Sequence, residues 1–222
     1  MPPMISVLSL LEARVLGVLV EKERTVPDTY PLTLNSLVTG CNQKTSRDPI
    51  ISASESEVQA AVDSLKSMSL VIESSGGRVA RYSHNFERVL QVPRQASALL
   101  AVLMLRGPQT AGELRINCER LHSFADISSV EAFLQELAGR PAGALVRELP
   151  RQPGSRENRW VHLLSGAPEV QESAPAPLAT TGGVDLGMSE LATLKAKVAR
   201  LENDVSELQA LVAKIASELG LR

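Results

Sequence analysis

The chain has 222 residues, of which 44% are hydrophobic and 22% charged, a composition typical of a folded globular protein rather than a disordered one. Aromatic residues make up only 3%, which favours packed helices with a Leu, Val and Ala core over an aromatic-rich β-sandwich. The formal net charge of −2 gives no overall attraction to nucleic acid, so any site for a polyanion has to be local.

No apolar run approaches the roughly 18 to 20 residues that span a bilayer, and no basic stretch or small-residue cleavage site precedes Glu12. We therefore expect a cytoplasmic protein without membrane contact. Cys41 and Cys118 fall at apolar helical positions, with no second Cys and no His at metal-ligand spacing. We interpret them as reduced core residues, with metal ligation or a disulfide as the alternatives.

The first helix is predicted to begin after Ser9, because Ser9 and Glu12 have the Ser-x-x-Glu form of a capping box. In a capping box each of the two side chains accepts a hydrogen bond from the backbone N–H of the other residue. The apolar residues that follow recur at helical spacing on one face: Leu11, Val15, Val18 and Leu19. The polar residues between them are expected to face water: Arg14, Glu21 and Lys22.

A second short helix is predicted from about Thr33 to Cys41, followed by a polar loop over 42–49, because the residue before Pro49 is biased out of the helical region. A second capping box, over 54–57, opens a third helix. Two strand-like runs, 70–73 and 78–82, then flank a Ser-Gly-Gly sequence that favours a tight hairpin turn.

The same order then repeats. A helix from about Pro93 ends at Gly107, and capping boxes over 110–113 and 128–131 open two further helices. Strand-like runs over 144–149 and 158–164 close the unit as a second hairpin, where Trp160 is predicted to belong to the core rather than to a stacking platform.

Three helices followed by a two-stranded hairpin are the pattern of a winged helix, a helix-turn-helix variant. The predicted fold class is mainly α with small β-hairpin wings. It comprises two tandem winged-helix domains, over 1–90 and 91–164, a flexible linker over 165–188, and a coiled-coil helix over 189–222. The fold alone does not establish DNA binding, because the same scaffold also docks proteins.

A strict heptad repeat supports the coiled coil, and its seam positions are all aliphatic: Leu191, Leu194, Val198, Leu201, Val205, Leu208, Val212, Ile215 and Leu219. Val at position a with Leu at position d favours a parallel two-stranded coil. We therefore predict a homodimer through these residues. The alternative is that the helix folds back onto its own chain.

The common phosphate, dinucleotide, nucleophile and zinc motifs are missing from the sequence. None of the three histidines, His84, His122 and His162, has a carboxylate or thiol at a spacing that indicates catalysis. We therefore expect neither an enzyme nor a bound cofactor or metal.

The charges give mixed evidence on nucleic acid. Both third helices carry acidic residues, Glu55, Glu57 and Asp63 in one and Glu131 and Glu136 in the other, which would repel a phosphate backbone. The cations lie in the 42–49 loop and in both hairpins: Lys44, Arg47, Arg78, Arg81, Arg147, Arg151, Arg156 and Arg159. The alternative for the second hairpin is a solvated loop that Glu148 and Glu157 partly neutralise.

Five blocks resemble the YceH-like family of bacterial proteins of unknown function: 11–17 (LEARVLG), 41–49 (CNQKTSRDP), 54–59 (SESEVQ), 105–115 (LRGPQTAGELR) and 153–157 (PGSRE). Ala111 and Trp160 stand where that family has proline and tyrosine. The resemblance implies paired winged-helix domains in a bacterial cytoplasm, and it implies no reaction, ligand or partner.

Two functional hypotheses follow. The first is a DNA-binding, regulatory homodimer that uses the wings and the polar loop, so that its nucleic-acid residues are the eight cations above together with Asn42, Gln43 and Thr45. The second is a protein-interaction adaptor in which the acidic third helices and the coiled coil bind partners, without DNA. The loop has a structural alternative as well, in which its Asn and Thr cap the neighbouring helix ends.

Overall fold

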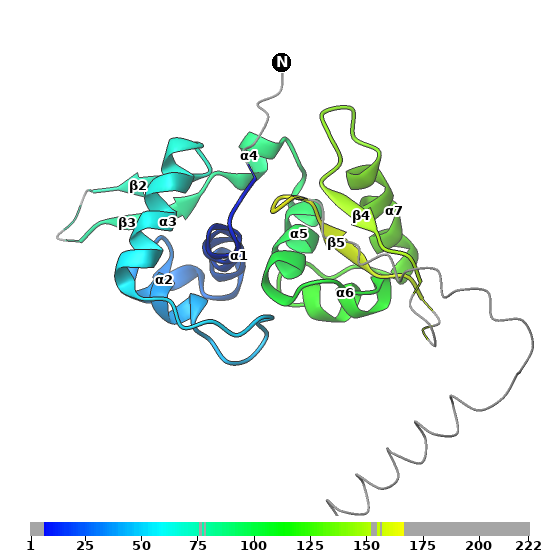
Figure 1. Ribbon diagram of the computed structural model, residues 1–222, viewed down its shortest axis with the longest axis horizontal. Helices are drawn as coiled ribbons and strands as arrows, with labels where there is room; N and C mark the ends of the chain where they lie inside the picture. The colour runs from blue at the N-terminus through cyan, green and yellow to red at the C-terminus, as the bar shows by residue number, and fades with distance from the viewer. Residues whose placement is uncertain (1–6, 76, 78, 152–154, 156, 167–222) are drawn as a thin grey trace, which may run out of the picture. The chain divides into compact units, whose positions relative to one another are not determined.

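The computed structural model describes residues 7–75, 77, 79–151, 155 and 157–166, all of which belong to one compact unit, residues 1–169. Within these residues the protein is mainly helical, with seven α-helices and two small antiparallel sheets (Figure 1). The predicted coiled coil over 189–222, and the predicted linker from residue 167 onward, lie outside the described residues.

The first half of the unit contains four helices and a three-stranded sheet. These are α1 (Leu10–Thr25), a 3₁₀ turn (Pro27–Thr29), β1 (Leu32–Thr33), α2 (Leu34–Cys41), α3 (Glu55–Ser67), β2 (Val71–Ser74), β3 (Arg81–His84) and α4 (Phe86–Leu90). The capping boxes that begin α1 and α3 both form as predicted, at Ser9 with Glu12 and at Ser54 with Glu57.

The second half contains α5 (Arg94–Arg106), α6 (Ala111–Cys118), α7 (Ile127–Ala138), β4 (Val146–Glu148) and β5 (Trp160–His162). The predicted capping box at Thr110 and Glu113 begins α6. The one predicted at Ser128 is wrong, because α7 begins two residues earlier than expected. Its N-cap is Asp126, whose carboxylate accepts the Ser129 N–H at 2.7 Å.

Each half has a strand segment before its second helix that the sequence patterns did not predict. In the first half, β1 pairs with β3 and places Leu32 opposite Tyr82. In the second half, Gln109 and Trp160 exchange backbone hydrogen bonds at 3.1 and 2.7 Å. Both segments lead directly into a threonine N-cap, Thr33 for α2 and Thr110 for α6. The two halves therefore share this β-paired segment and its threonine N-cap in addition to the order of helices and hairpins.

The first hairpin differs from its prediction. β3 begins at Arg81, where it pairs with Ser74, so six residues connect the paired ends instead of a tight Ser-Gly-Gly turn. The short helix α4 was also missed. The predicted strand over 78–82 was therefore placed about three residues too early.

The central helices α1 and α5 pack against each other, and theirs is the most extensive helix–helix contact among the described residues (Figure 1). Gly17 permits the close approach, since a Cβ there would lie 2.9 Å from the Leu105 Cγ. On its other side α1 contacts α2 and α3, while α5 contacts α6 and α7. Both helices are therefore buried around their circumference, without the single apolar face that the spacing predicted for α1.

The smaller predictions about the core are confirmed. Cys41 and Cys118 are buried free thiols, and Trp160 is 5% exposed. Burial raises the pKa of both thiols to about 12, so neither is a reactive thiolate. No helix in the described part of the chain is long and apolar enough to cross a membrane.

Candidate functional site

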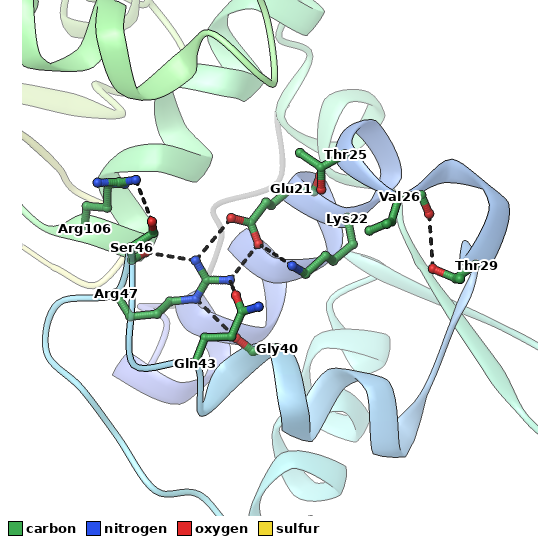
Figure 2. A network of polar contacts seen from close by, with 10 residues as sticks. All are labelled: Glu21, Lys22, Thr25, Val26, Thr29, Gly40, Gln43, Ser46, Arg47 and Arg106. Carbon is green, nitrogen blue, oxygen red and sulfur yellow. Dashed lines mark hydrogen bonds and ion pairs between the residues drawn. The ribbon is translucent and has the colours of Figure 1, made fainter. Parts of the chain in front are cut away.

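The 42–49 loop was predicted to present Arg47 to a phosphate backbone, but its side chain is 0% exposed. All five guanidinium N–H groups donate within the protein (Figure 2). Two reach Glu21 on α1, at 3.2 and 2.6 Å, and the others reach the Gly40 carbonyl, the Ser46 carbonyl and the Gln43 side chain at 2.6 to 3.2 Å. Arg47 therefore has no donor left for a ligand and acts as a structural residue.

The Glu21 carboxylate completes this buried ion pair. Its side chain is only 16% exposed, and it also lies 3.3 Å from the Lys22 ammonium. Burial alone would raise the pKa of Glu21, but the hydrogen bonds and charge of Arg47, followed by Lys22, outweigh burial and hold it below the usual value. Glu21 is therefore ionised at neutral pH and fixes the guanidinium in place.

A second arginine holds the other side of the same loop. Arg14 is 1% exposed, and it donates to the Cys41 carbonyl at 3.2 Å and to the Pro49 carbonyl at 2.7 Å. The expectation that Arg14 faces water is wrong, because α1 is buried on all sides and the guanidinium finds its partners in the loop backbone. Burial, and then the nearby charge of Arg47, lower the pKa of Arg14.

Asn42 ties the loop to the start of α3. Its side-chain amide donates to the Ala53 carbonyl and accepts the Ala53 N–H, both at 2.8 Å. Ala53 directly precedes the N-cap of α3, so this pair supports the structural alternative for Asn42. Of the loop residues proposed to bind nucleic acid, Lys44 and Thr45 are left exposed, while Gln43 is half-buried and accepts from Arg47.

In the first hairpin, Arg81 is exposed and donates to the Pro31 carbonyl at 2.8 Å, which anchors the segment before β1. Arg78 lies outside the described residues. The charge of Arg81 is still accessible, although its orientation is fixed by a structural contact.

The second hairpin presents its cations differently. The register places Arg147 opposite Val161, and the Leu149 N–H donates to the Arg159 carbonyl, so Arg147 and Arg159 share one face of the hairpin. Both side chains are exposed. Arg159 makes only long contacts, 3.4 Å to both the Pro108 carbonyl and Glu113, and no partner of Arg147 is found among the described residues.

The rest of the second hairpin carries both charges. Arg151 is exposed and donates to the Ser155 carbonyl at 2.6 Å, and Arg156 lies outside the described residues. Glu148 alternates to the face opposite Arg147, where it accepts from Asn158 at 2.9 Å. Glu148 therefore lies on the face opposite Arg147 and Arg159, while Arg151 lines a pocket together with Glu148 and Glu157.

The third helices present acidic side chains to solvent, as the sequence indicated. The exposed residues of α3 include Glu55, Glu57 and Asp63, and those of α7 include Glu131 and Glu136. Neither helix has an exposed arginine or lysine of its own within its bounds, since Lys66 is half-buried and pairs with Asp63 at 3.5 Å and with Glu73. These faces repel phosphate.

The structure adds a feature that the sequence patterns missed, a polar cleft of about 230 Å³ where α1, the 42–49 loop, α5 and the end of α6 meet. Its charged lining residues are Glu21, Lys22, Arg106 and Arg120. Arg106 donates to the Ser46 hydroxyl at 2.7 Å and so joins α5 to the loop (Figure 2). These residues are up to 99 positions apart in the chain, so no local motif could have indicated the cleft.

One histidine, His84, gains polar partners that spacing could not predict. The His84 ring nitrogen Nε2 lies 3.0 Å from the Glu23 carboxylate, and its backbone N–H donates to the Tyr30 hydroxyl at 2.7 Å. Burial lowers the pKa of His162 to about 4. In the described part of the chain, no three His, Cys, Asp or Glu side chains gather as a metal site.

Comparison of the amino-acid sequence with known proteins identifies the family of this chain. Residues 8–155 match a family model described as "Protein of unknown function, DUF480". The chain is 63% identical over 211 residues to a UPF0502 protein of Dechloromonas aromatica (strain RCB), covering 95% of this chain and 97% of the relative. It is 59% identical over 212 residues to a UPF0502 protein of Burkholderia ambifaria (strain MC40-6), covering 95% and 89%.

The chain therefore belongs to the DUF480/UPF0502 family of bacterial proteins of unknown function. The relatives carry the UPF0502 description, and the similarity to the YceH-like family remains a resemblance. These descriptions give no reaction, ligand or partner, so functional conclusions depend on the geometry.

Proposed function

We propose that the protein is a non-enzymatic, cytoplasmic, DNA-binding regulator built from two tandem winged-helix domains. The repeated order of elements supports this assignment. Each half contains three helices, a hairpin and a short β-paired segment before the second helix, which is β1 in one half and the bridge residue Gln109 in the other. Such a hairpin can lie along the DNA backbone and supply arginine contacts there.

The second hairpin is the leading DNA contact. The observation that carries this proposal is the shared, exposed face of Arg147 and Arg159, with Glu148 on the opposite face. The acidic exposed residues of α3 and α7 argue against insertion of those helices into a groove. Within the loop, burial of Arg47 limits any contribution to Lys44 and Thr45.

A titration of labelled duplex DNA tests the proposal. We expect binding at about 50 mM salt that weakens steeply by about 200 mM, and Arg147→Ala with Arg159→Ala should lower the slope of log affinity against log salt by about 2. The matched control removes two other exposed cations, through Arg88→Ala with Arg94→Ala, and should leave binding nearly unchanged. Lack of binding by the wild type at about 50 mM salt would refute the proposal.

The regulator is further proposed to be a homodimer through the heptad positions over 191–219. Mass photometry or sedimentation at micromolar concentration should give dimers for the wild type and monomers for Leu201→Glu with Leu208→Glu, since a charge at position d removes the seam. Monomeric wild type under these conditions would contradict dimerisation.

The acidic surfaces favour a second candidate function, a protein-interaction adaptor without DNA binding. Exposed carboxylates on α3 and α7 suit a basic partner surface. Affinity capture should then return a partner that Glu131→Lys with Glu136→Lys loses and that the Arg147 and Arg159 variant keeps. The reverse dependence, or capture without a reproducible partner, would exclude the adaptor.

A further inference from the structure

We propose that the polar cleft between α1, the 42–49 loop, α5 and α6 binds a small anion that carries a phosphate group and thereby joins the two halves of the unit. The inference does not depend on DNA binding, since its cationic lining residues, Lys22, Arg106 and Arg120, are not among the proposed DNA contacts. It rests on three cationic side chains that line one cavity with too few carboxylates among the described residues to neutralise them.

Three cationic side chains line the cleft, Lys22, Arg106 and Arg120, and the only lining carboxylate among the described residues is Glu21. Both Glu21 oxygens are already used by the Arg47 guanidinium, and one of them also by Lys22. That carboxylate therefore cannot neutralise Arg106 and Arg120 as well.

The two arginines retain free donors. Arg106 uses one nitrogen to donate to the Ser46 hydroxyl, and Arg120 is exposed, with no hydrogen bond or ion pair to the rest of the described chain. The acidic residue next to it, Glu119, accepts from the Ser123 hydroxyl at 2.9 Å. A guanidinium with free N–H groups matches two phosphate oxygens at once, which an ammonium group does not.

Neutral donors complete the lining. Gln43 accepts from Arg47 through its carbonyl oxygen, which leaves its amide NH₂ free, and Thr45 adds an exposed hydroxyl to the lining of the cleft. The buried ion pair behind Gln43 fixes this side chain before any ligand arrives (Figure 2). Such preorganised donors lower the cost of binding.

The positive charge near the cleft extends to Arg24 of α1, which does not itself line the cleft. The Arg24 side chain is 8% exposed, and two of its guanidinium nitrogens have no hydrogen-bond partner in the described part of the protein, while the third pairs with Glu87 at 2.7 Å. Burial raises the pKa of Cys118, at the end of α6, and the charges of Arg24 and Arg106 act on the same thiol in the opposite direction. A bound anion would offset this positive potential.

The volume limits the ligand. At about 230 Å³ the cleft is smaller than the roughly 300 to 1,000 Å³ of pockets for drug-sized molecules. It suits pyrophosphate or a sugar phosphate better than a whole dinucleotide. Its walls come from both halves, so the ligand would add contacts to the Arg106–Ser46 hydrogen bond that already joins them.

Calorimetric titration of the full chain tests this site, with pyrophosphate and glucose 6-phosphate as probes and malate as a dicarboxylate without phosphate, all at constant ionic strength. We expect saturable binding of at least one phosphate probe, and a loss of about tenfold in affinity for Arg120→Gln, whose side chain has no hydrogen bond or ion pair with the described residues to lose. Thermal unfolding without ligand should be the same for Arg120→Gln and the wild type.

The matched control is Arg94→Gln, another exposed arginine, which should bind like the wild type. The proposal is overturned if no phosphate probe saturates below about 10 mM, if malate binds as tightly, or if both variants weaken binding equally. It is also overturned if Arg120→Gln reduces duplex DNA binding while small phosphates fail to compete, because the cleft would then receive a DNA phosphate.

Discussion

The connection between the second and third helices is built in two different ways in the two halves of the protein. In the first half, residues 42–54 are held by buried charge, with Arg14 and Arg47 donating to backbone carbonyls and to Glu21. In the second half, residues 119–126 are held by aromatic packing and by the half-buried Arg115, which donates to the Phe124 and Ala125 carbonyls at 3.3 Å, without a buried ion pair among the described residues. Phe124 is 3% exposed, and its ring centroid lies 4.7 Å from that of His122 and 6.0 Å from that of Phe133.

The comparison shows that one order of elements does not require one kind of interaction. A buried ion pair must offset a large desolvation cost, and it does so only while both partners and their hydrogen bonds are present. Aromatic packing depends mainly on area and shape and is largely independent of salt and pH. The two halves should therefore respond differently to substitution and to acid.

The largest expected effect is that of Arg47→Ala. The Glu21 side chain is only 16% exposed in the wild type, so the variant leaves a largely buried carboxylate with Lys22 as its one remaining cation among the described residues. We therefore expect the free energy of unfolding to fall by about 4 kcal/mol. Urea unfolding followed by circular dichroism measures this change. The matched control Arg88→Ala, at an exposed position, should stay within about 0.5 kcal/mol of the wild type.

The variant Glu21→Leu with Arg47→Met separates the charge effect from general damage to the loop. It removes both charges together, and so it should recover most of the stability that Arg47→Ala loses. If the double variant is as unstable as the single one, the hydrogen bonds to Gly40 and Ser46, and not the ion pair, hold the loop.

Phe124→Ala should lower the free energy of unfolding by about 3 kcal/mol, because it empties a buried ring position in the second half. The loss should be the same at about 50 mM and about 500 mM salt, since the substitution removes no charge and keeps the Phe124 carbonyl that Arg115 contacts. A strong dependence on salt would contradict the contrast between the two connections.

Acid should act on the second half through His162. Burial lowers its pKa in the folded protein to about 4 from an ordinary value near 6.5, so the unfolded chain binds the proton first. Stability is therefore lost as pH falls from about 6.5 towards 4, by about 2 kcal/mol at pH near 4.5. His162→Gln should show a smaller loss over this range in urea unfolding at several pH values, and an unchanged pH dependence would contradict the assignment.

The smallest expected effect tests the start of α7. Asp126→Ala should cost about 1 kcal/mol, because the carboxylate accepts the Ser129 N–H at the helix start. Ser128→Ala, at the N-cap that the sequence predicted, should cost much less. Thermal unfolding of the two variants compares them directly, and a larger effect at Ser128 would restore the original prediction.

Local patterns predicted most of the secondary structure. Capping boxes at Ser9, Ser54 and Thr110 are recognisable because the two residues that interact are three positions apart. At α7 a Ser-x-x-Glu sequence competed with Asp126, which lies two residues nearer the N-terminus, and the pattern could not rank them. The strand segments β1 and Gln109 are too short to show any periodicity.

The candidate sites were harder to predict, because burial of a charge depends on distant partners. Arg47 is preceded by the polar residues 42–46 and followed by Asp48, a pattern typical of a solvated loop, and its partner Glu21 is 26 residues away. The cations of the cleft come from α1, from the last turn of α5 and from the segment after α6, which only the packing of α1 on α5 brings together. By contrast, the second-hairpin arginines proposed from the sequence as DNA contacts are exposed at the three positions that the structure describes, Arg147, Arg151 and Arg159.

The burial of α1 on every side has a consequence for how this chain can be divided. Because α1 packs on α5 as well as on α2 and α3, neither half carries a complete core of its own. A fragment cut near residue 90 would expose the apolar surface of α1 that α5 normally covers. The two halves are thus duplicates in plan but not interchangeable modules, and recombination between relatives should succeed only when both central helices are inherited together.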